Sequence, residues 1–360
     1  MASLATAVMM VVTLTAADIK RDEVVLFYPT YAYATEDSKT WNLLIHGSIF
    51  QPEQDSVKRT LLIAAMRRTL GVAANSPEAP ILDQRLRPFL VDHKKGREID
   101  IQIGRTVARL GKSTTDGHIA TQIRLPADKV PPAPGAQDAA ERWLSFETVM
   151  PQGDQRRFFG RVRLIGRSGL SVISDIDDTI KISQVRDRKA LLANTFLREF
   201  QAVPDMAELF GQLAAGGAVF HYVSGSPWQL YEPLAQFCRS ERFPPGTFHL
   251  KDFRLSDPSA LLKLTAQEDY KLAAIAPILA AFPERRFVLV GDSGEQDPEI
   301  YGKLAGKYGR QIAAIFIRNV TDEKPENERF RKAFAGTDRW RLFRQPDELR
   351  PLVTELLRTK

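Results

Sequence analysis

The chain has 360 residues, 44% of them hydrophobic and 26% charged, so it is long enough for two domains and has an ordinary globular composition. Its 22 glycines and 22 prolines exclude a collagen-like or wholly disordered chain, and its single cysteine, Cys238, excludes an intramolecular disulfide. The formal net charge of +6 suits an anionic partner, although charge alone fits a generally basic soluble protein equally well.

Residues 1–17 contain no charged side chain, and an apolar stretch from Leu4 to Leu14 is followed by small residues. The stretch is shorter than the ~20 residues that span a bilayer. It predicts a secretory signal peptide, although the basic residues that usually begin one are missing. We therefore expect an exported protein, periplasmic or secreted. If the segment is instead a short buried strand or helix, a cytoplasmic location is expected.

Residues 22–166 predict a β-rich, sandwich-like domain. The runs 23–34 and 40–52 are rich in β-branched and aromatic residues and are bounded by Pro, Gly or Ser. "EIDIQIG" alternates apolar and polar residues, which places Ile99, Ile101 and Ile103 on one face. Further strands are expected at 118–126 and 156–166, and one helix is expected at 55–70.

Residues 168–360 have a different sequence pattern, in which short apolar strands alternate with helices. We expect strands at 169–177, 218–226, 286–293 and 313–320, and helices at 204–215, 228–240, 268–282, 297–308 and 346–358. This alternation predicts an α/β domain with a Rossmann-like parallel sheet and helices on both faces. In such sheets ligands bind beyond the carboxyl ends of the strands.

The first of these strands ends in the acidic sequence "SDIDDT". Asp175 and Asp177 are two residues apart in an extended segment, so their side chains project to one side and repel each other unless a cation lies between them. Mg²⁺ is the natural cation for such a carboxylate site. The alternative is a polar cap at a strand–helix turn. Asp178 points the other way, and we expect it to form hydrogen bonds within the turn or to pair with a base.

Three further stretches strengthen the functional interpretation. "VFHYVSGSPW" ends a strand at Ser224, whose hydroxyl can bind a phosphate oxygen, and at Gly225, which allows close backbone approach. Lys271 begins a helix and can neutralise phosphate or carboxylate charge. "RFVLVGDSGEQDPEIY" contributes Asp292, a further Mg²⁺ ligand, and Asp297, which could hold a metal-bound water or position the lysine.

Together these stretches resemble motifs I to IV of the haloacid dehalogenase superfamily over residues 170–320. The resemblance implies that Asp175 is the nucleophile that forms an aspartyl-phosphate and that Asp177 is first a general acid and then a general base. The backbone carbonyl of Asp177 and the carboxylates of Asp175 and Asp292 would bind Mg²⁺. Thr179 belongs to the same catalytic group and is expected to orient the loop through its hydroxyl.

The longer stretches "SVISDIDDTIKIS", "NTFLREF", "FHYVSGSPWQLY" and "RFVLVGDSGEQDPEIY" resemble the phosphatidate phosphatase family of the fungal actin-patch type, including its bacterial members. The β-rich region resembles the accompanying domain of that family more loosely. The family implies Mg²⁺-dependent hydrolysis of phosphatidate to diacylglycerol, and so a place in lipid metabolism. The expected partners are a phosphorylated lipid and, transiently, a membrane surface, but no nucleic acid.

The spacing between motifs leaves little room for a cap domain over this site. About 25 residues separate Thr179 from the helix near Pro204. The 46 residues between Ser224 and Lys271 already contain a helix (228–240), a strand (247–253) and a short helix (258–263). We therefore expect a capless or minimally capped, open site, which suits a lipid headgroup or a macromolecular substrate.

The substrate contacts predicted from the sequence are Ser224, Gly225, Ser226, Trp228 and Lys181. Lys181, with Arg186, Arg188 and Lys189, could meet an anionic headgroup or bilayer, or could be part of a solvated charged face. Trp228 could touch an acyl chain or pack at a helix start. His221 is expected to be a core histidine with a partner, and Cys238 a small core residue.

Two rival functions remain open at this stage. The first is the same chemistry on a soluble or macromolecular phosphoester. The second is a non-catalytic module that docks on a membrane or a partner through its β domain. The presence of Asp175, Asp177, Lys271 and Asp292 together argues against the second, because a pseudoenzyme usually loses one such residue.

Overall fold

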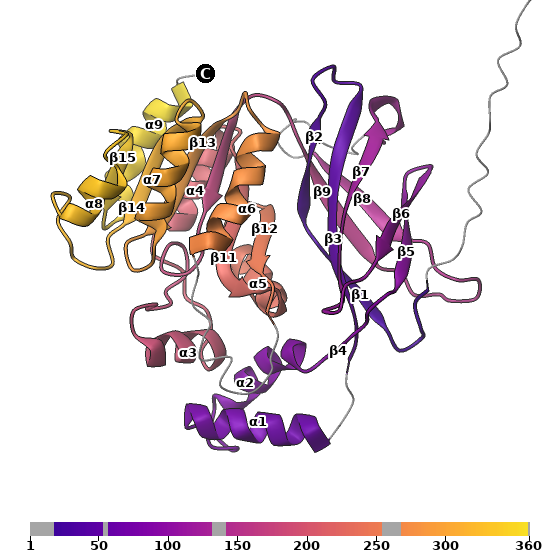
Figure 1. Ribbon diagram of the computed structural model, residues 1–360. Coiled ribbons are helices and arrows are strands. Elements are labelled where there is room, and N and C mark those ends of the chain that lie inside the picture. Colours follow the sequence, from indigo (N-terminus) through magenta and orange to yellow (C-terminus); the bar gives the residue numbers. More distant parts are fainter. Residues whose placement is uncertain (1–17, 53–56, 132–141, 254–267, 359–360) are drawn as a thin grey trace, which may run out of the picture.

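The computed structural model describes residues 18–52, 57–131, 142–253 and 268–358. Two domains lie side by side, a β-sheet domain and an α/β domain, and a pair of helices from the first reaches beneath the second (Figure 1). The proposed signal segment 1–17 and the short helix expected at 258–263 lie outside the described residues. Among the residues that are described, no helix is both long and apolar enough to cross a membrane.

The first domain is built from nine strands that form one connected sheet. They are β1 (Val24–Tyr28), β2 (Thr30–Ala34), β3 (Thr40–Gln51), β4 (Asp92–His93), β5 (Glu98–Ile103), β6 (Thr106–Lys112), β7 (His118–Pro126), β8 (Trp143–Thr148) and β9 (Phe159–Ile165). The order is β1-β3-β2-β9-β8-β5-β6, with β4 and β7 also paired to β3. β6 lies against β7, so the sheet curls around a core that includes Leu43, Ile101 and Val162.

Two helices interrupt this sheet between β3 and β4. α1 (Val57–Leu70) matches the helix predicted at 55–70, whereas α2 (Ala79–Leu86) and the 3₁₀ turn η1 (Arg87–Phe89) were not predicted. α2 is short, and Pro80 in its first turn is compatible with a helix start. Its apolar side, with Leu82 and Leu86, is buried in the same cluster as residues of the α/β domain. Tertiary contact therefore stabilises this short helix.

The second domain contains a six-stranded parallel sheet. Its strands are β10 (Leu170–Ser174), β11 (Val219–Pro227), β12 (Gly246–Lys251), β13 (Arg286–Asp292), β14 (Ile312–Arg318) and β15 (Trp340–Phe343), in the order β12-β11-β10-β13-β14-β15. Every adjacent pair is parallel. The predicted parallel sheet is therefore confirmed, and the short edge strand β15 is an addition to the prediction.

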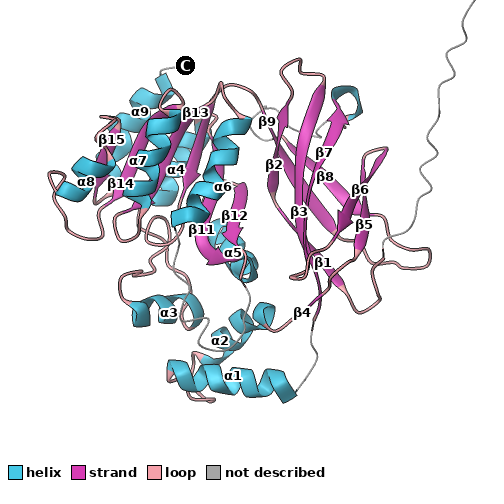
Figure 2. Ribbon diagram, viewed as in Figure 1, coloured by secondary structure: helices cyan, strands magenta, loops and turns pink. Residues whose placement is uncertain are grey.

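Helices cover both faces of this sheet (Figure 2). They are α3 (Arg188–Phe196), α4 (Met206–Ala215), α5 (Tyr231–Ser240), α6 (Glu268–Ala281), α7 (Asp297–Tyr308), α8 (Glu328–Ala333) and α9 (Arg350–Arg358), with 3₁₀ turns η4 (Trp228–Leu230) and η6 (Pro346–Leu349) before α5 and α9. Alternate strand residues face opposite ways: Val172 packs in the cluster with α4, α5 and α9, and Ile173 in the cluster with α6 and α7. The five predicted helices are confirmed, whereas the short helices α3 and α8 were not predicted.

Candidate active site

Three adjacent strands bring the predicted site residues together at one edge of the parallel sheet. β10 lies between β11 and β13, so the residues that follow these strands meet. Asp175 follows β10 directly and its backbone N–H donates to the Val290 carbonyl at 2.9 Å. Ser224 lies near the end of β11, and Asp292 is the last residue of β13. The strands themselves are mostly apolar and buried on both faces, so the polar site residues lie at the carboxyl ends of the strands.

Lys271, in the first turn of α6, is the cation at the centre of this group. Its Nζ lies 2.9 Å from Asp175 Oδ1, 2.5 Å from Asp297 Oδ1 and 3.1 Å from Glu295 Oε2. The side chain is only 1% exposed. Burial alone would lower the pKa of Lys271, but the surrounding carboxylates outweigh burial and raise it well above its ordinary value. Lys271 is therefore a permanently charged group in a dry site.

Asp175, Asp292 and Asp297 form a buried acidic cluster, with one oxygen of each lying within 4.8 Å of the others. Asp292 Oδ1 accepts from Gly294 N at 2.6 Å, while Asp292 Oδ2 is buried and has no hydrogen-bond partner. Burial, with repulsion from neighbouring carboxylates, raises the pKa of Asp292 well above its usual range, and burial also raises that of Asp175 despite the Lys271 cation. These hard oxygen donors fit Mg²⁺ or a similar divalent cation.

Asp297 lies in the acidic cluster that could hold a metal ion, and it also contacts Lys271, which it was predicted to position. Both oxygens of Asp297 are already engaged, Oδ1 by Lys271 and Oδ2 by the Asp292 backbone N–H at 3.1 Å, so the residue positions the lysine and the loop. The Asp177 side chain lies outside the acidic cluster. The ligand role predicted for Asp177 through its backbone carbonyl stays a prediction.

The carboxylate of Asp177 is held by four side chains. Oδ1 accepts from Lys181 Nζ and Ser183 Oγ, each at 2.7 Å, and Oδ2 accepts from Ser224 Oγ and Ser226 Oγ, each at 2.9 Å. Burial alone would raise the pKa of Asp177, but the Lys181 cation and these hydrogen bonds hold it below its usual range. Asp177 is therefore ionised, and it occupies the serine hydroxyls that were predicted to meet phosphate.

The turn after Asp177 supports the local role predicted for Asp178. Asp178 has a left-handed backbone (φ 54°), and its carboxylate accepts from the backbone N–H groups of Ser183, Gln184 and Val185 at 2.7–2.8 Å. This closes the loop that carries Lys181 and Ser183. Thr179 Oγ1 donates to Asp175 Oδ2 at 3.0 Å, so the threonine holds the candidate nucleophile directly.

Lys181 and Trp228 do not lie at a free surface. Lys181 is 1% exposed and pairs with Asp177, which corrects the expectation that it faces a headgroup or bilayer; Arg186, Arg188 and Lys189 are exposed. A buried carboxylate needs a nearby cation, which explains the inward position. Trp228 packs against Tyr28 of the β domain, with ring centroids 4.1 Å apart.

The two remaining side-chain predictions are confirmed. His221 is a buried core histidine whose Nδ1 lies 2.8 Å from Thr247 Oγ1. Cys238 is buried in the core of the α/β domain, and burial raises the pKa of its thiol to about 12. Neither residue touches the acidic site.

Among the described residues, α3 narrows one side of the site that was predicted to be open. The cavity beside Asp177, Gly225 and Ser226 measures only about 20 Å³, and Leu191, Leu192 and Thr195 of α3 line its other side. α3 is held in place from the β domain: Arg85 of α2 donates to the Thr195 carbonyl at 2.5 Å and stacks 3.6 Å from the centre of the Phe200 ring. Counting residues between motifs overlooked this cover, because its support comes from a distant insertion.

Glu295, Ser183 and Arg329 also belong to the site and were not predicted. Glu295 approaches Lys271 and lines the small cavity. Ser183 bridges Lys181 and Asp177. Arg329 donates to the Ser293 carbonyl at 2.5 Å and braces the loop between Asp292 and Asp297. Glu295 and Ser183 lie inside the quoted stretches "GDSGEQD" and "SVISDIDDTIKIS", whereas Arg329 lies beyond the motifs and had no signal.

Fold and site together define an α/β domain whose buried carboxylates and lysines gather at the carboxyl ends of parallel strands. Residues 170–319 match the sequence model of the family described as the catalytic domain of phosphatidate phosphatase APP1. The match of this segment confirms the resemblance to the APP1-type phosphatidate phosphatase family that was seen in the sequence.

Two fungal relatives show the extent of the similarity. The chain is 40% identical over 154 residues to phosphatidate phosphatase APP1 of Saccharomyces cerevisiae, which covers 42% of this chain and 26% of the relative. It is 30% identical over 189 residues to an uncharacterised protein of Schizosaccharomyces pombe, covering 50% of this chain and 31% of that protein. The chain thus spans roughly a quarter to a third of the length of these relatives.

The similarity of this chain to a solved structure is only distant. A chain of the Pnkp1/Rnl/Hen1 complex matches with a TM-score of 0.31 and 13% identity, covering 43% of this chain and 47% of that chain.

Proposed function

We propose that this protein is a Mg²⁺-dependent phosphatase of the haloacid dehalogenase superfamily, with phosphatidate as its substrate and diacylglycerol as its lipid product. The main observation that supports the proposal is the buried group formed by Asp175, Asp292 and Lys271. Thr179 donates a hydrogen bond to Asp175 in the same group. The name of the yeast relative supports the choice of phosphatidate. We further propose an exported enzyme that meets its lipid transiently at a membrane surface.

Asp175 and Asp292 would hold the Mg²⁺, together with the backbone carbonyl of Asp177. The partnerless Asp292 Oδ2 and the raised pKa values of both carboxyls fit a site that lacks one positive charge. When bound, the ion would neutralise the carboxylates and the incoming phosphate, which otherwise repel each other. Lys271 supplies the protein's own positive charge to Asp175 Oδ1.

Catalysis would proceed in two steps, transfer of the phosphoryl group to Asp175 and then hydrolysis. A carboxylate oxygen of Asp175 attacks phosphorus, the bond from phosphorus to the diacylglycerol oxygen breaks, and Asp177 gives that oxygen a proton. Water then attacks the phosphorus of the aspartyl-phosphate and gives a proton to Asp177, which releases phosphate and regenerates Asp175. Thr179 and Lys271 hold the two Asp175 oxygens in place throughout.

The ionised state of Asp177 sets a requirement for the first step. A general acid must carry a proton, whereas Lys181 and the serines favour the charged form. A phosphate that binds at Ser224 would take over that hydroxyl's hydrogen bond and bring negative charge close to Asp177. Both changes raise the pKa of Asp177, so substrate binding itself would favour the protonated acid.

Turnover by the purified protein tests this function. Phosphate release should be measured with dioctanoyl phosphatidate and with a panel of soluble phosphomonoesters, with Mg²⁺ or with a chelator. We expect Mg²⁺-dependent turnover that favours phosphatidate. A strong preference for a soluble ester would contradict the lipid substrate and leave the same chemistry standing, and inactivity on every ester would favour a binding module.

A further inference from the structure

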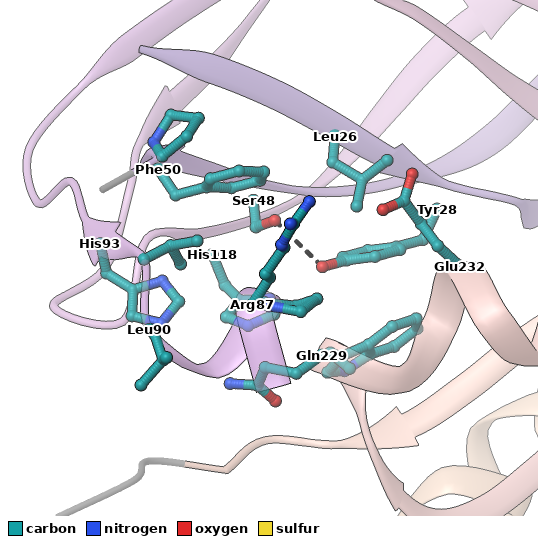
Figure 3. Close-up of a pocket in the computed structure, with 14 residues that line it drawn as sticks. Leu26, Tyr28, Ser48, Phe50, Arg87, Leu90, His93, His118, Gln229 and Glu232 are labelled. Carbon is teal, nitrogen blue, oxygen red and sulfur yellow. Dashed lines mark hydrogen bonds between the residues drawn. The ribbon is translucent and has the colours of Figure 1, made fainter. Parts of the chain in front are cut away.

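A second, much larger cavity lies between the two domains. It measures about 480 Å³, within the range of roughly 300–1,000 Å³ that is typical of pockets for small organic ligands. In Figure 3, Leu26 and Phe50 from the sheet of the β domain lie on one side, and Leu90 and Gln229 lie on the other. The remaining apolar lining comes from Pro52, Pro88, Val91 and Trp228.

Two pairs of polar side chains in or beside the wall are bonded to each other, whereas the buried Gln229 Oε1 has no hydrogen-bond partner. Tyr28 Oη and Ser48 Oγ lie 3.0 Å apart, and His118 Nδ1 lies 3.0 Å from His46 Nε2. The charged residues Arg87 and Glu232 are exposed, which places them at the mouth. A peptide or nucleotide inside the pocket would lose hydrogen bonds to water that this wall replaces poorly, whereas a hydrocarbon chain would lose none.

One short segment of chain connects this pocket with the catalytic site. Ser226 binds Asp177, and Ser226 and Pro227 line the small catalytic cavity. The next two residues, Trp228 and Gln229, line the interdomain pocket. Residues 226–229 therefore contribute to the walls of both cavities.

The catalytic cavity measures about 20 Å³, so a phosphate monoester can enter it only by its phosphate end. The glycerol and acyl chains of a phosphatidate must therefore lie outside it. We propose that the interdomain pocket binds one fatty acyl chain of the lipid substrate, and this inference rests on the function proposed above. The β domain would then contribute Leu26 and Phe50 to substrate recognition.

Chain-length dependence tests the pocket. We would compare kcat/KM for dioctanoyl and dibutyryl phosphatidate below their micelle concentrations, and use an aryl phosphate to check that the chemistry is intact. The wild-type protein should prefer the longer chains at least tenfold (about 1.4 kcal/mol). Leu90→Asp, which places a charge in the pocket, should reduce this preference at least fivefold, and Leu90→Trp, which narrows the pocket, should reduce it as well.

Leu61→Asp is the matched control, because Leu61 is 65% exposed on α1 and lines neither cavity. It should keep the wild-type ratio. Turnover of both phosphatidates with the same chain-length ratio in the wild-type protein and both Leu90 variants would overturn the pocket alone. Turnover of the aryl phosphate with no turnover of either phosphatidate would overturn the lipid substrate, and the acyl pocket with it.

Discussion

In the β domain each buried carboxylate among the described residues has its own arginine. In the α/β domain, two buried carboxylates and the half-buried Glu295 share one lysine. Glu23 is fully buried and lies 2.6 Å from Arg97, and Asp100 lies 2.9 Å from Arg109. By contrast, Lys271 is shared by Asp175, Glu295 and Asp297, and Asp292 lies beside them without a cation of its own.

This difference separates structural charge from functional charge. The charge of a buried carboxylate that pairs with an arginine is neutralised, and the pair adds little to the net stability of the fold. An excess of buried carboxylates costs stability, because each charge is desolvated and repels its neighbours. Such an excess is typical of sites that bind a cation or a charged substrate. The α/β domain, not the β domain, therefore contains the site of chemistry.

Asp292→Asn gives the largest expected effect, because it removes part of the charge excess. We expect hydrolysis to fall at least a hundredfold, since a cation ligand and its charge are lost. The free energy of unfolding measured with a chelator present should rise by about 1–3 kcal/mol, because a partnerless buried charge is removed. The matched control, Asp100→Asn, leaves activity unchanged and lowers stability. A lower free energy of unfolding for Asp292→Asn would contradict the claim that the site carries destabilising excess negative charge.

Arg97→Met tests the matched pair in the β domain. It leaves Glu23 buried without its cation, so denaturant unfolding should show a loss of about 3–5 kcal/mol. The kcat of the folded enzyme should not change, because Arg97 lies far from the acidic cluster in the fold. If kcat fell while stability stayed constant, the division between structural and functional charge would fail.

Arg85→Ala tests the contact that joins the two regions. Loss of the hydrogen bond to Thr195 and of the stacking on Phe200 should loosen α3 over the site, and we expect kcat/KM to fall about tenfold. Arg85→Lys should restore only part of the activity, because an ammonium group cannot stack as a planar guanidinium does. Arg67→Ala, which breaks the pair with Asp83 within the same insertion, should leave kcat/KM unchanged. Equal losses in both alanine variants would indicate a general effect on the insertion.

The smallest expected effect is a pH dependence of the contact between the domains. Burial, with repulsion from His118, lowers the pKa of His46 to about 3, and this ring packs against Trp228. In the unfolded chain His46 has its ordinary pKa of 6.5, so the unfolded state binds the proton first. Stability is therefore complete above pH 6.5 and falls as the pH drops toward 3. His46→Phe should reduce this slope by at most about 1.4 kcal/mol per pH unit. If the change of stability with pH were the same in His46→Phe, His46 would not be the group that causes it.

The sequence was most informative where one chemical pattern determines position. Continuous apolar strands that end in polar residues predicted the parallel sheet and placed Asp175, Lys271 and Asp292 together. The same reasoning predicted the turn formed by Asp178. These features are local, because each depends on a strand, its end and the residues that follow directly.

The features that were missed depend on long-range contact. α3 lines the site, and Arg85, more than 100 residues earlier in the chain, donates a hydrogen bond to its Thr195 carbonyl. Lys181 was expected at the surface, but it is buried because its ammonium group pairs with the buried Asp177 carboxylate. Such outcomes follow from pairing across the fold, which spacing along the sequence does not reveal.

The most direct test of the central claim is to trap the phosphoryl group on Asp175. The enzyme should be mixed with phosphate-labelled phosphatidate and Mg²⁺, quenched in acid within one turnover and reduced with borohydride, which converts an acyl phosphate to an alcohol. Peptide mapping should then find homoserine at position 175 in the wild-type protein and no trapped product in Asp175→Asn. Unmodified Asp175 during active turnover, or hydrolysis that persists in Asp175→Asn, would contradict the account.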